Sequence, residues 1–434
     1  MKRIFTLFMC FLMALTFTAC DDYSNAGVAD EKPKEENNIE QQEDIVEIAE
    51  EAEEYPTLRV RTDEIKACEY KSDSGKLLYH STYPEVTLSD EDALKYPELS
   101  KALREFVEEE KETAVRGEAE AKAIIDETIE NYPEYDMELY DTKVARIRRG
   151  DDTVLSIQLY YNGYSGGAHG FYSNGGVTFD TKTGEKISFS NVVVNKSAFL
   201  DAVAEKLDER REELCFGEST NIRELIDGEN MFEWTLENDS VTVYFAPYVI
   251  APFAAGAPSV TISATEYPGL INEKYISHSE CFAMELFTDT FAYDVTGDGV
   301  ADRIMVYDWW DYDGENEVQS LKVMVNEKEY SDKLSFEDAE ATFVKTADGK
   351  FYIYVDVTYE NSGDILCFEL SECIKKIDVL EDLFIRRDDT GDGSPGPNRR
   401  WVITNPESFF LEDYEQNNYE YRVGKNGIPE RKDK

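Results

Sequence analysis

Apolar and polar residues alternate along several segments of this chain, and this two-residue period narrows the choice of fold. The clearest runs are Leu155, Ile157, Leu159 and Tyr161, and further along Val241, Val243 and Phe245. Side chains of a strand point alternately to opposite faces, so each run predicts a strand with one face on a core. Residues 58–70 and 76–88 predict two more strands around a turn at 72–75, and residues 177–180 and 186–189 predict a hairpin.

Two helices are predicted among these strands. Leu99, Leu103 and Phe106 follow Pro97 at three-to-four-residue spacing, which predicts a helix from Pro97 to about residue 129 with a weak point at Gly117. A second helix is predicted over residues 197–214. Strands with interspersed helices favour an α+β fold with mainly antiparallel sheets, packed helices and a β-rich C-terminal domain.

The amino terminus has the order of a secretory signal. Lys2 and Arg3 precede an uncharged apolar run over residues 4–17, which is too short to span a bilayer. Small residues then lead into Cys20, so residues 1–20 predict a lipoprotein signal and Cys20 the lipidated residue. The chain is therefore expected to be extracytoplasmic and lipid-anchored to the cell membrane. The alternative is an ordinary cleaved signal with Cys20 as an incidental thiol.

The charge of the chain restricts its partners. Acidic residues number 92 against 44 basic ones, a formal net charge of −48. Such a charge repels nucleic acids, which excludes them as partners, and attracts metal ions and basic proteins. Solubility at a crowded surface is an equally open interpretation. Residues 21–56 are rich in charge and poor in large apolar groups, so they predict an acidic disordered tether.

Changes of pattern divide the remaining chain into three predicted segments. Residues 57–145 and 146–278 each have an α+β pattern, and residues 284–434 are β-rich. The cysteines after the anchor are Cys68, Cys215, Cys281, Cys367 and Cys373. An odd number without C-x-x-C spacing predicts neither a disulfide framework nor a zinc site, although up to two bridges stay open.

Two motifs in the middle of the chain carry a family resemblance. The first motif covers residues 160–170 and ends in Gly166-Gly167-Ala168-His169-Gly170; residues 178–184 follow it. The second motif covers residues 243–252 and includes Ala246-Pro247-Tyr248-Val249-Ile250-Ala251-Pro252, ahead of Ala255-Gly256. Over about residues 58–275 the chain resembles the extracytoplasmic domain pair of the lysozyme-responsive anti-sigma factor family, also found in some peptidoglycan deacetylases. The resemblance implies a sensory or binding module outside the cell, in one member for a cationic muramidase. No segment resembles the sigma-binding or deacetylase part.

Residue types within these motifs point to a ligand-binding surface. His169 lies in a glycine-rich turn, where glycines supply positive φ and the ring either caps backbone groups or contacts a ligand. Tyr164, Tyr248 and Phe253 are the aromatic candidates for the same surface. A general base needs a nucleophile or second carboxylate, and spacing assigns none, so no catalytic residue is predicted.

A short acidic loop is the best candidate for a metal site. Its ligands would be the side chains of Asp294, Thr296, Asp298 and Asp302 and the Val300 carbonyl. Oxygen ligands at this spacing, with a glycine between Asp298 and Val300 for the sharp turn, are what Ca²⁺ requires. The alternative is an acidic Asx turn. Residues 388–393 repeat the start of this pattern.

The sequence as a whole predicts a non-catalytic envelope lipoprotein that binds a peptidoglycan fragment or a cationic protein such as lysozyme, with Ca²⁺ bound to its last domain. Two other classes stay open: a wall hydrolase or esterase with a site near His169, and a structural envelope protein without a specific ligand. Of Trp309 and Trp310, we expect one in the core because tryptophan is usually buried.

Overall fold

The structure is a computed structural model that describes residues 57–432, except 132–137, 229–230, 287–290, 314–315, 360–361, 385, 388–398 and 414–416. Its sheets are mostly antiparallel and its C-terminal part is β-rich, so the predicted α+β class is confirmed. The signal, Cys20, the tether and the second Asp/Gly loop lie outside the described residues. Among the residues described, no helix is both long and apolar enough to cross a membrane.

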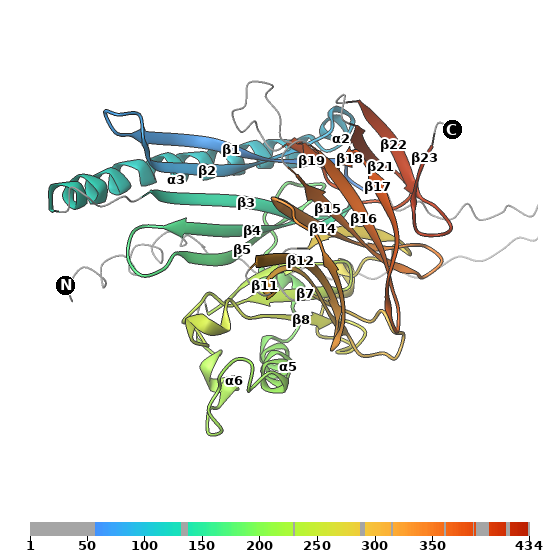
Figure 1. The fold of residues 1–434 in the computed structure, drawn as a ribbon. Coiled ribbons are helices and arrows are strands. Elements are labelled where there is room, and N and C mark those ends of the chain that lie inside the picture. Colours follow the sequence, from blue (N-terminus) through green and yellow to red (C-terminus); the bar gives the residue numbers. More distant parts are fainter. Residues whose placement is uncertain are drawn as a thin grey trace, which may run out of the picture. The chain divides into compact units, whose positions relative to one another are not determined.

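A seven-stranded sheet forms the first layer, in the order β19-β20-β1-β2-β3-β4-β5 (Figure 1). Its strands are β1 (Val60–Lys71), β2 (Leu77–Leu88), β3 (Leu139–Gly150), β4 (Val154–Tyr164), β5 (Phe171–Asp180), β19 (Arg386–Arg387) and β20 (Arg399–Trp401). The predicted strands at 58–70 and 76–88 are confirmed as the β1–β2 pair. Strands β2 and β3 run parallel, and the chain between them includes the helices α2 (Asp90–Lys95) and α3 (Pro97–Asn131).

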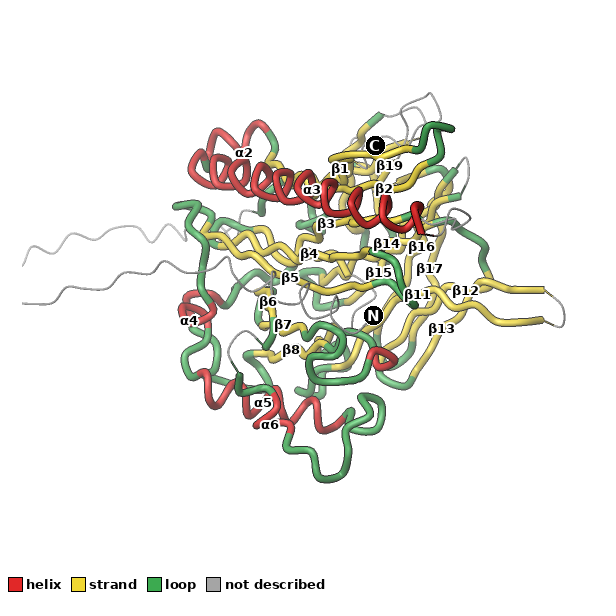
Figure 2. Tube along the Cα trace, turned by 90° about the vertical axis from the view of Figure 1, so that its left-hand side faces the viewer, coloured by secondary structure: helices red, strands yellow, loops and turns green. Residues whose placement is uncertain are grey.

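Helix α3 covers one face of this sheet (Figure 2). It begins at Pro97, as the sequence predicts, and its buried Leu99, Leu103 and Phe106 pack on apolar side chains of the sheet. The helix runs unbroken through Gly117, so the predicted weak point is wrong. A Cβ at Gly117 would lie 3.0 Å from the Tyr79 hydroxyl, so the glycine serves close packing of helix on sheet.

A smaller helical and three-stranded layer follows in the chain. Its elements are α4 (Phe189–Val192), α5 (Lys196–Glu209), α6 (Ile222–Leu225), β6 (Glu233–Leu236), β7 (Ser240–Tyr244), η1 (Phe253–Ala255), β8 (Ser259–Ser263) and η2 (Glu273–Tyr275). Helix α5 ends at Glu209, five residues before the predicted end at 214, and residues 210–215 continue as turns. Its C-cap residue Arg210 donates to Glu213 and to the Ser259 carbonyl. The predicted hairpin at 177–189 is reduced to one bridge, Phe179 to Lys186, since a capping box at Ser188 starts α4.

The C-terminal part is a stack of three sheets. One outer sheet consists of β10 (Phe291–Tyr293), β11 (Asp302–Asp313), β12 (Asn316–Val325) and β13 (Lys328–Lys333). The other outer sheet consists of β18 (Leu383–Phe384), β21 (Phe409–Asp413), β22 (Asn418–Val423) and β23 (Pro429–Arg431). Between them lie β9 (Phe282–Leu286), β14 (Asp338–Lys345), β15 (Phe351–Thr358), β16 (Gly363–Leu370) and β17 (Ile374–Glu381). Because both faces of the middle sheet are covered, β15 is buried over six consecutive residues rather than at alternate ones.

Three buried arginines on β3 join these layers. Arg146 pairs with Glu340 of β14, and Arg148 donates to Glu237, next to β6, at 3.2 Å and to the Glu285 carbonyl of β9 at 2.9 Å. Arg149 donates to the carbonyls of residues 237 and 275. A single strand of the first sheet therefore contacts both later parts of the chain, and residues from 54 onward group as one compact unit. The boundaries at 145 and 278 stay predictions.

Candidate functional site

Glycines shape the hairpin between β4 and β5. Gly166 and Gly167 have φ values of 87° and 119°, which confirms that glycines supply the positive φ of this turn. A Cβ at Gly163 would lie 2.4 Å from the Phe171 ring, and a Cβ at Gly170 would lie 2.8 Å from the Gly163 carbonyl oxygen. The two strands can therefore close tightly, and the turn presents His169 at its end.

A second loop, between β7 and β8, reaches the same place. Tyr248 has φ = 69°, a left-handed conformation that is unusual for a residue with a bulky side chain. Hydrogen bonds within the loop hold this conformation, among them one from the Tyr248 N–H to the Ala251 carbonyl at 3.1 Å. Pro252 precedes Phe253, the first residue of η1. The loop therefore carries two rings in a fixed backbone, and 64% of the Tyr248 surface is exposed.

The two loops meet in what we call the ring cluster, which consists of His169, Tyr172, Tyr248 and Phe253. The His169 and Phe253 rings stack with centroids 4.1 Å apart and planes at 26°. Tyr248 lies 5.6 Å from Phe253, and Tyr172 of β5 meets Phe253 edge-on at 5.6 Å. Three of the four residues expected from sequence are thus brought together at one surface.

The hydrogen bonds of His169 define its protonation pattern. Nδ1 lies 2.7 Å from the Gly170 carbonyl oxygen, which can only accept, so Nδ1 carries a proton. Nε2 lies 3.3 Å from the Tyr248 hydroxyl, which donates to the neutral ring and accepts from the charged one. These two partners, a backbone carbonyl and a tyrosine hydroxyl, orient the ring, and neither supplies the nucleophile or second carboxylate that a general base needs.

Tyr164, which the sequence predicts at the binding surface, is not part of the ring cluster. Tyr164 packs toward Tyr140 at 6.4 Å, and its hydroxyl donates to the Gly167 carbonyl at 2.9 Å, so it supports the turn. Tyr172 supplies the fourth ring of the cluster and was missed. The available signal was that this aromatic residue lies two positions after Gly170, at the end of the glycine-rich motif.

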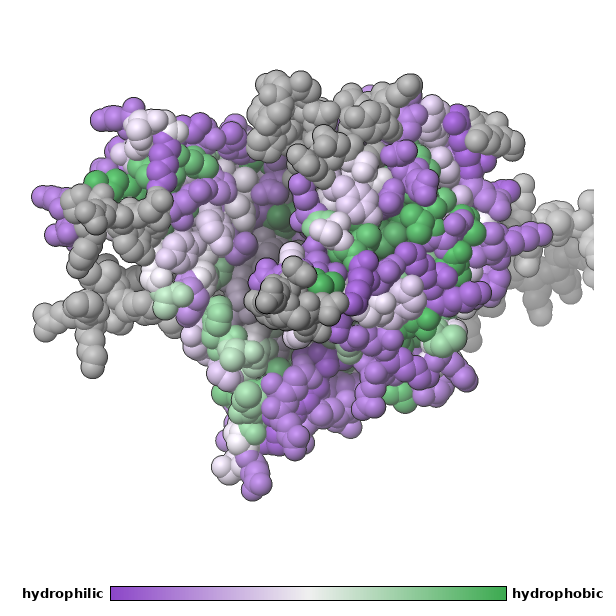
Figure 3. Space-filling model, viewed as in Figure 1, coloured by the Kyte–Doolittle hydropathy of each residue, from purple (hydrophilic) through white to green (hydrophobic). Residues whose placement is uncertain are grey.

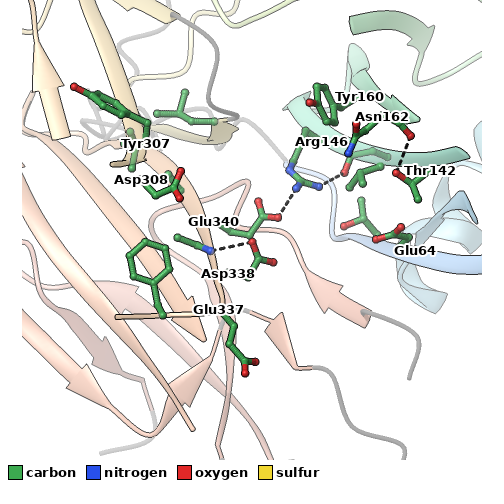
Figure 4. Close-up of a pocket in the computed structure, with 18 of the residues that line it drawn as sticks. Glu64, Thr142, Arg146, Tyr160, Asn162, Tyr307, Asp308, Glu337, Asp338 and Glu340 are labelled. Atoms are coloured by element: carbon green, nitrogen blue, oxygen red, sulfur yellow. Dashed lines mark hydrogen bonds and ion pairs between the residues drawn. The ribbon is translucent and has the colours of Figure 1, made fainter. Parts of the chain in front are cut away.

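A cavity of about 350 Å³ lies between the seven-stranded sheet and the C-terminal sheets (Figure 4). Its walls carry six carboxylates, from Asp63, Glu64, Asp308, Glu337, Asp338 and Glu340. The one basic residue in its wall is the buried Arg146, whose charge is paired with Glu340. The cavity therefore has an acidic lining that favours cations. Hydrophilic residues also cover most of the face drawn in Figure 3.

In the candidate calcium loop, the carboxylates bind backbone amides. Asp294 accepts from the N–H groups of Gly297, Asp298 and Gly299, at 2.6–3.2 Å. Asp302 accepts from the N–H groups of residues 295 and 296 at 2.9 Å. Within the described residues, no three acidic, histidine or cysteine side chains are grouped to hold a metal. The loop has the geometry of an Asx turn, and Ca²⁺ binding stays a prediction.

Part of this chain matches a known family. Residues 191–265 match the family described as "Protein of unknown function (DUF3298)". This segment contains Tyr248 and Phe253 of the ring cluster, whereas His169 and Tyr172 precede it. No curated protein matches the chain significantly.

Two solved structures of the same family are similar to this chain. One is a DUF3298 member from Bacteroides fragilis NCTC 9343, with 16% identity and a TM-score of 0.37, covering 51% of this chain and 96% of its own. The other is a DUF3298 protein from Pseudomonas aeruginosa PAO1, with 15% identity and a TM-score of 0.33, covering 52% of this chain and 98% of its own. The comparisons therefore identify a domain of unknown function and assign no ligand.

One expectation from the sequence is changed by the structure. Trp309 and Trp310 are both exposed, at 51% and 54%, so the expectation that one lies in the core is wrong. Neighbouring residues of a strand point to opposite faces of the sheet, and both faces of the β11–β12 hairpin are exposed at these two positions. The Lys322 ammonium lies over the Trp309 ring, and the Trp310 ring N–H donates to Asp308. The five cysteines within the described residues, Cys68, Cys215, Cys281, Cys367 and Cys373, are all free thiols.

Proposed function

We propose that this chain is a non-catalytic binding module of the cell envelope, and that the ring cluster is its contact surface for a cationic extracellular protein. The observation that carries the proposal is the meeting of two loops, 79 residues apart at His169 and Tyr248, in one stacked and partly exposed aromatic surface. Aromatic side chains held in a rigid loop lose little conformational entropy on binding.

The chemistry of the cluster fits a basic side chain of the partner. The face of a tyrosine or phenylalanine ring attracts an ammonium or guanidinium group, and the exposed Tyr248 ring offers such a face beside Phe253, which supports it. The net charge of −48 would draw a basic protein toward the chain and speed its association. The acidic cavity lined by Glu64 and Glu337 adds to the same field.

The proposed place of action is the outer face of a membrane, through a lipid on Cys20. This rests on the charged, apolar and small-residue order of residues 1–20. Expression of the full chain with Cys20→Ala should move the protein from the membrane fraction to the soluble one and remove the acyl mass from the mature amino terminus. A wild-type chain without acyl mass would contradict this part of the proposal.

The binding proposal is tested with the full chain and two immobilised ligands, a basic muramidase and solubilised peptidoglycan fragments. Tyr248→Ala and Phe253→Ala should each weaken capture of the muramidase by about ten-fold, since a well-desolvated cation–π contact contributes about 1–2 kcal/mol. Added salt should weaken it further by screening. Trp310→Ala is the matched control, because it removes another exposed aromatic ring from a different element.

Two outcomes would reject this assignment. Full capture by both ring-cluster variants would exclude the cluster as the contact surface. Capture of wall fragments but not of the muramidase would mean that the ligand is a saccharide and not a protein.

A further inference from the structure

A groove of about 570 Å³ lies where the first sheet meets the last strands of the chain. Its lining includes Arg59, which directly precedes β1, and Arg61 of β1. It also includes Arg104 of α3, Trp401 of β20 and Phe410 of β21. It shares no residue with the ring cluster. A volume of this size is within the range of about 300–1,000 Å³ that small-molecule sites have.

Two of the arginines lie on aromatic rings. The Arg61 guanidinium carbon is 5.1 Å from the Trp401 ring centroid, and that of Arg59 is 5.8 Å from the Phe410 centroid. The two rings are themselves 5.8 Å apart. A guanidinium stacked on a ring is held flat, and its N–H groups stay available along its edge.

The groove has an excess of positive charge in a strongly acidic chain. Among the described residues, no carboxylate forms an ion pair with Arg61 or Arg104, and Arg104 donates instead to the Ser100 hydroxyl at 2.9 Å. Arg59 pairs with Glu91, whose side chain is 79% exposed. One carboxylate, that of Asp90, is in the lining. The groove therefore has three arginines and one acidic residue, whereas acidic residues outnumber basic ones in the whole sequence.

We propose that this groove binds an anionic sugar that carries a carboxylate or a phosphate. The N–H edges of Arg61 and Arg104 match the oxygens of either anion, and Arg–anion hydrogen bonds are charge-assisted. The Trp401 and Phe410 rings give the sugar ring an apolar surface to pack on. Repulsion by distant carboxylates is screened beyond about 8 Å at physiological salt, so the arginines dominate at contact.

Isothermal titration of the purified full chain tests this assignment with three probes: glucuronic acid, glucose 6-phosphate and uncharged glucose. At least one charged probe should bind saturably and about ten-fold more tightly than glucose, as charge-assisted recognition requires. The stronger of the two charged probes identifies the anionic group. Arg61→Gln and Arg104→Gln should each weaken that binding by about ten-fold.

Arg116→Gln is the matched control. Arg116 is an exposed residue of the same helix as Arg104, lies outside the groove, and its loss changes the net charge equally. Retained affinity in this variant supports the groove as the site. Equal weakening by all three substitutions, equal binding of glucose, or no saturable binding by the folded wild-type chain would each overturn the proposal.

Discussion

At the scale of single residues, Tyr248 combines an exposed ring with a strained backbone. Its φ of 69° is in the left-handed region, where a residue with a side chain is less stable than glycine by roughly 1 kcal/mol. Such strain often occurs at functional sites. We predict that Tyr248→Gly unfolds in more urea than Tyr248→Ala, by about 1 kcal/mol in the free energy of unfolding. Both variants lack the ring and should lose binding equally, and an alanine variant as stable as the glycine one would contradict the strain.

Residue environment also separates the five free thiols. Burial raises the pKa of the Cys367 thiol to about 12, and the charge of Asp378 adds to this effect. Cys215 and Cys373 are exposed. Since the thiolate is the reactive form, maleimide at about pH 8 should modify Cys373 within minutes and leave Cys367 unmodified until the chain is unfolded. Raising the pH should accelerate the modification of the exposed thiols and leave Cys367 unmodified. Peptide mass spectrometry checks this, and equal native rates would be inconsistent with the buried site.

At the scale of elements, the contact between β5 and β6 depends on a missing side chain. A Cβ at Gly176 would lie 1.8 Å from the Trp234 carbonyl oxygen, which is backbone and cannot move alone. Gly176→Ala should therefore lower the free energy of unfolding by about 3 kcal/mol, at the upper end for overpacking. Gly217→Ala is the control, since its Cβ would meet its nearest neighbour at 3.5 Å. Equal unfolding midpoints in urea would argue against the close approach.

The arginines of β3 give a second prediction at this scale. Replacing Arg148 by Met leaves the fully buried Glu237 carboxylate without its guanidinium, and burial already raises the pKa of that carboxyl. Removing one partner of a buried ion pair lowers the free energy of unfolding by about 3–5 kcal/mol. The control Arg223→Met, which breaks exposed ion pairs, should lower it by less than about 1 kcal/mol. The double variant Arg148→Met, Glu237→Leu should recover much of the loss. Urea unfolding of the three variants decides whether this pair joins the layers.

The strands and helices were largely predictable from sequence, whereas the contacts between distant segments were not. The alternation at Leu155 and Ile157 predicts β4 because one face of that strand packs on α3. No local pattern predicts that β20 would join the edge of β1, because strand pairing across more than 300 residues leaves no periodic signal. The motifs identified three ring-cluster residues, His169, Tyr248 and Phe253. They could not identify the contact between Arg61 and Trp401, because these residues lie near opposite ends of the chain.

At the scale of the whole molecule, a charge of −48 means that every cation stabilises the chain to some degree by screening. If Ca²⁺ binds specifically at residues 294–302, it must therefore stabilise the chain more than screening alone does. Asp294 already accepts three backbone hydrogen bonds and Asp298 one, so Asp298 has the most free lone pairs for a cation. Extracellular calcium modules bind with dissociation constants of about 0.1–1 mM.

We predict that CaCl₂ at about ten times such a dissociation constant raises the free energy of unfolding by about 1.4 kcal/mol more than NaCl of equal ionic strength. Asp298→Asn should remove this difference. Asp73→Asn, which changes the net charge equally at an exposed turn outside both this loop and the acidic cavity, should keep it. If both salts stabilise the wild-type chain equally, the loop is an acidic turn held by its own amides, and calcium affects this molecule only through screening.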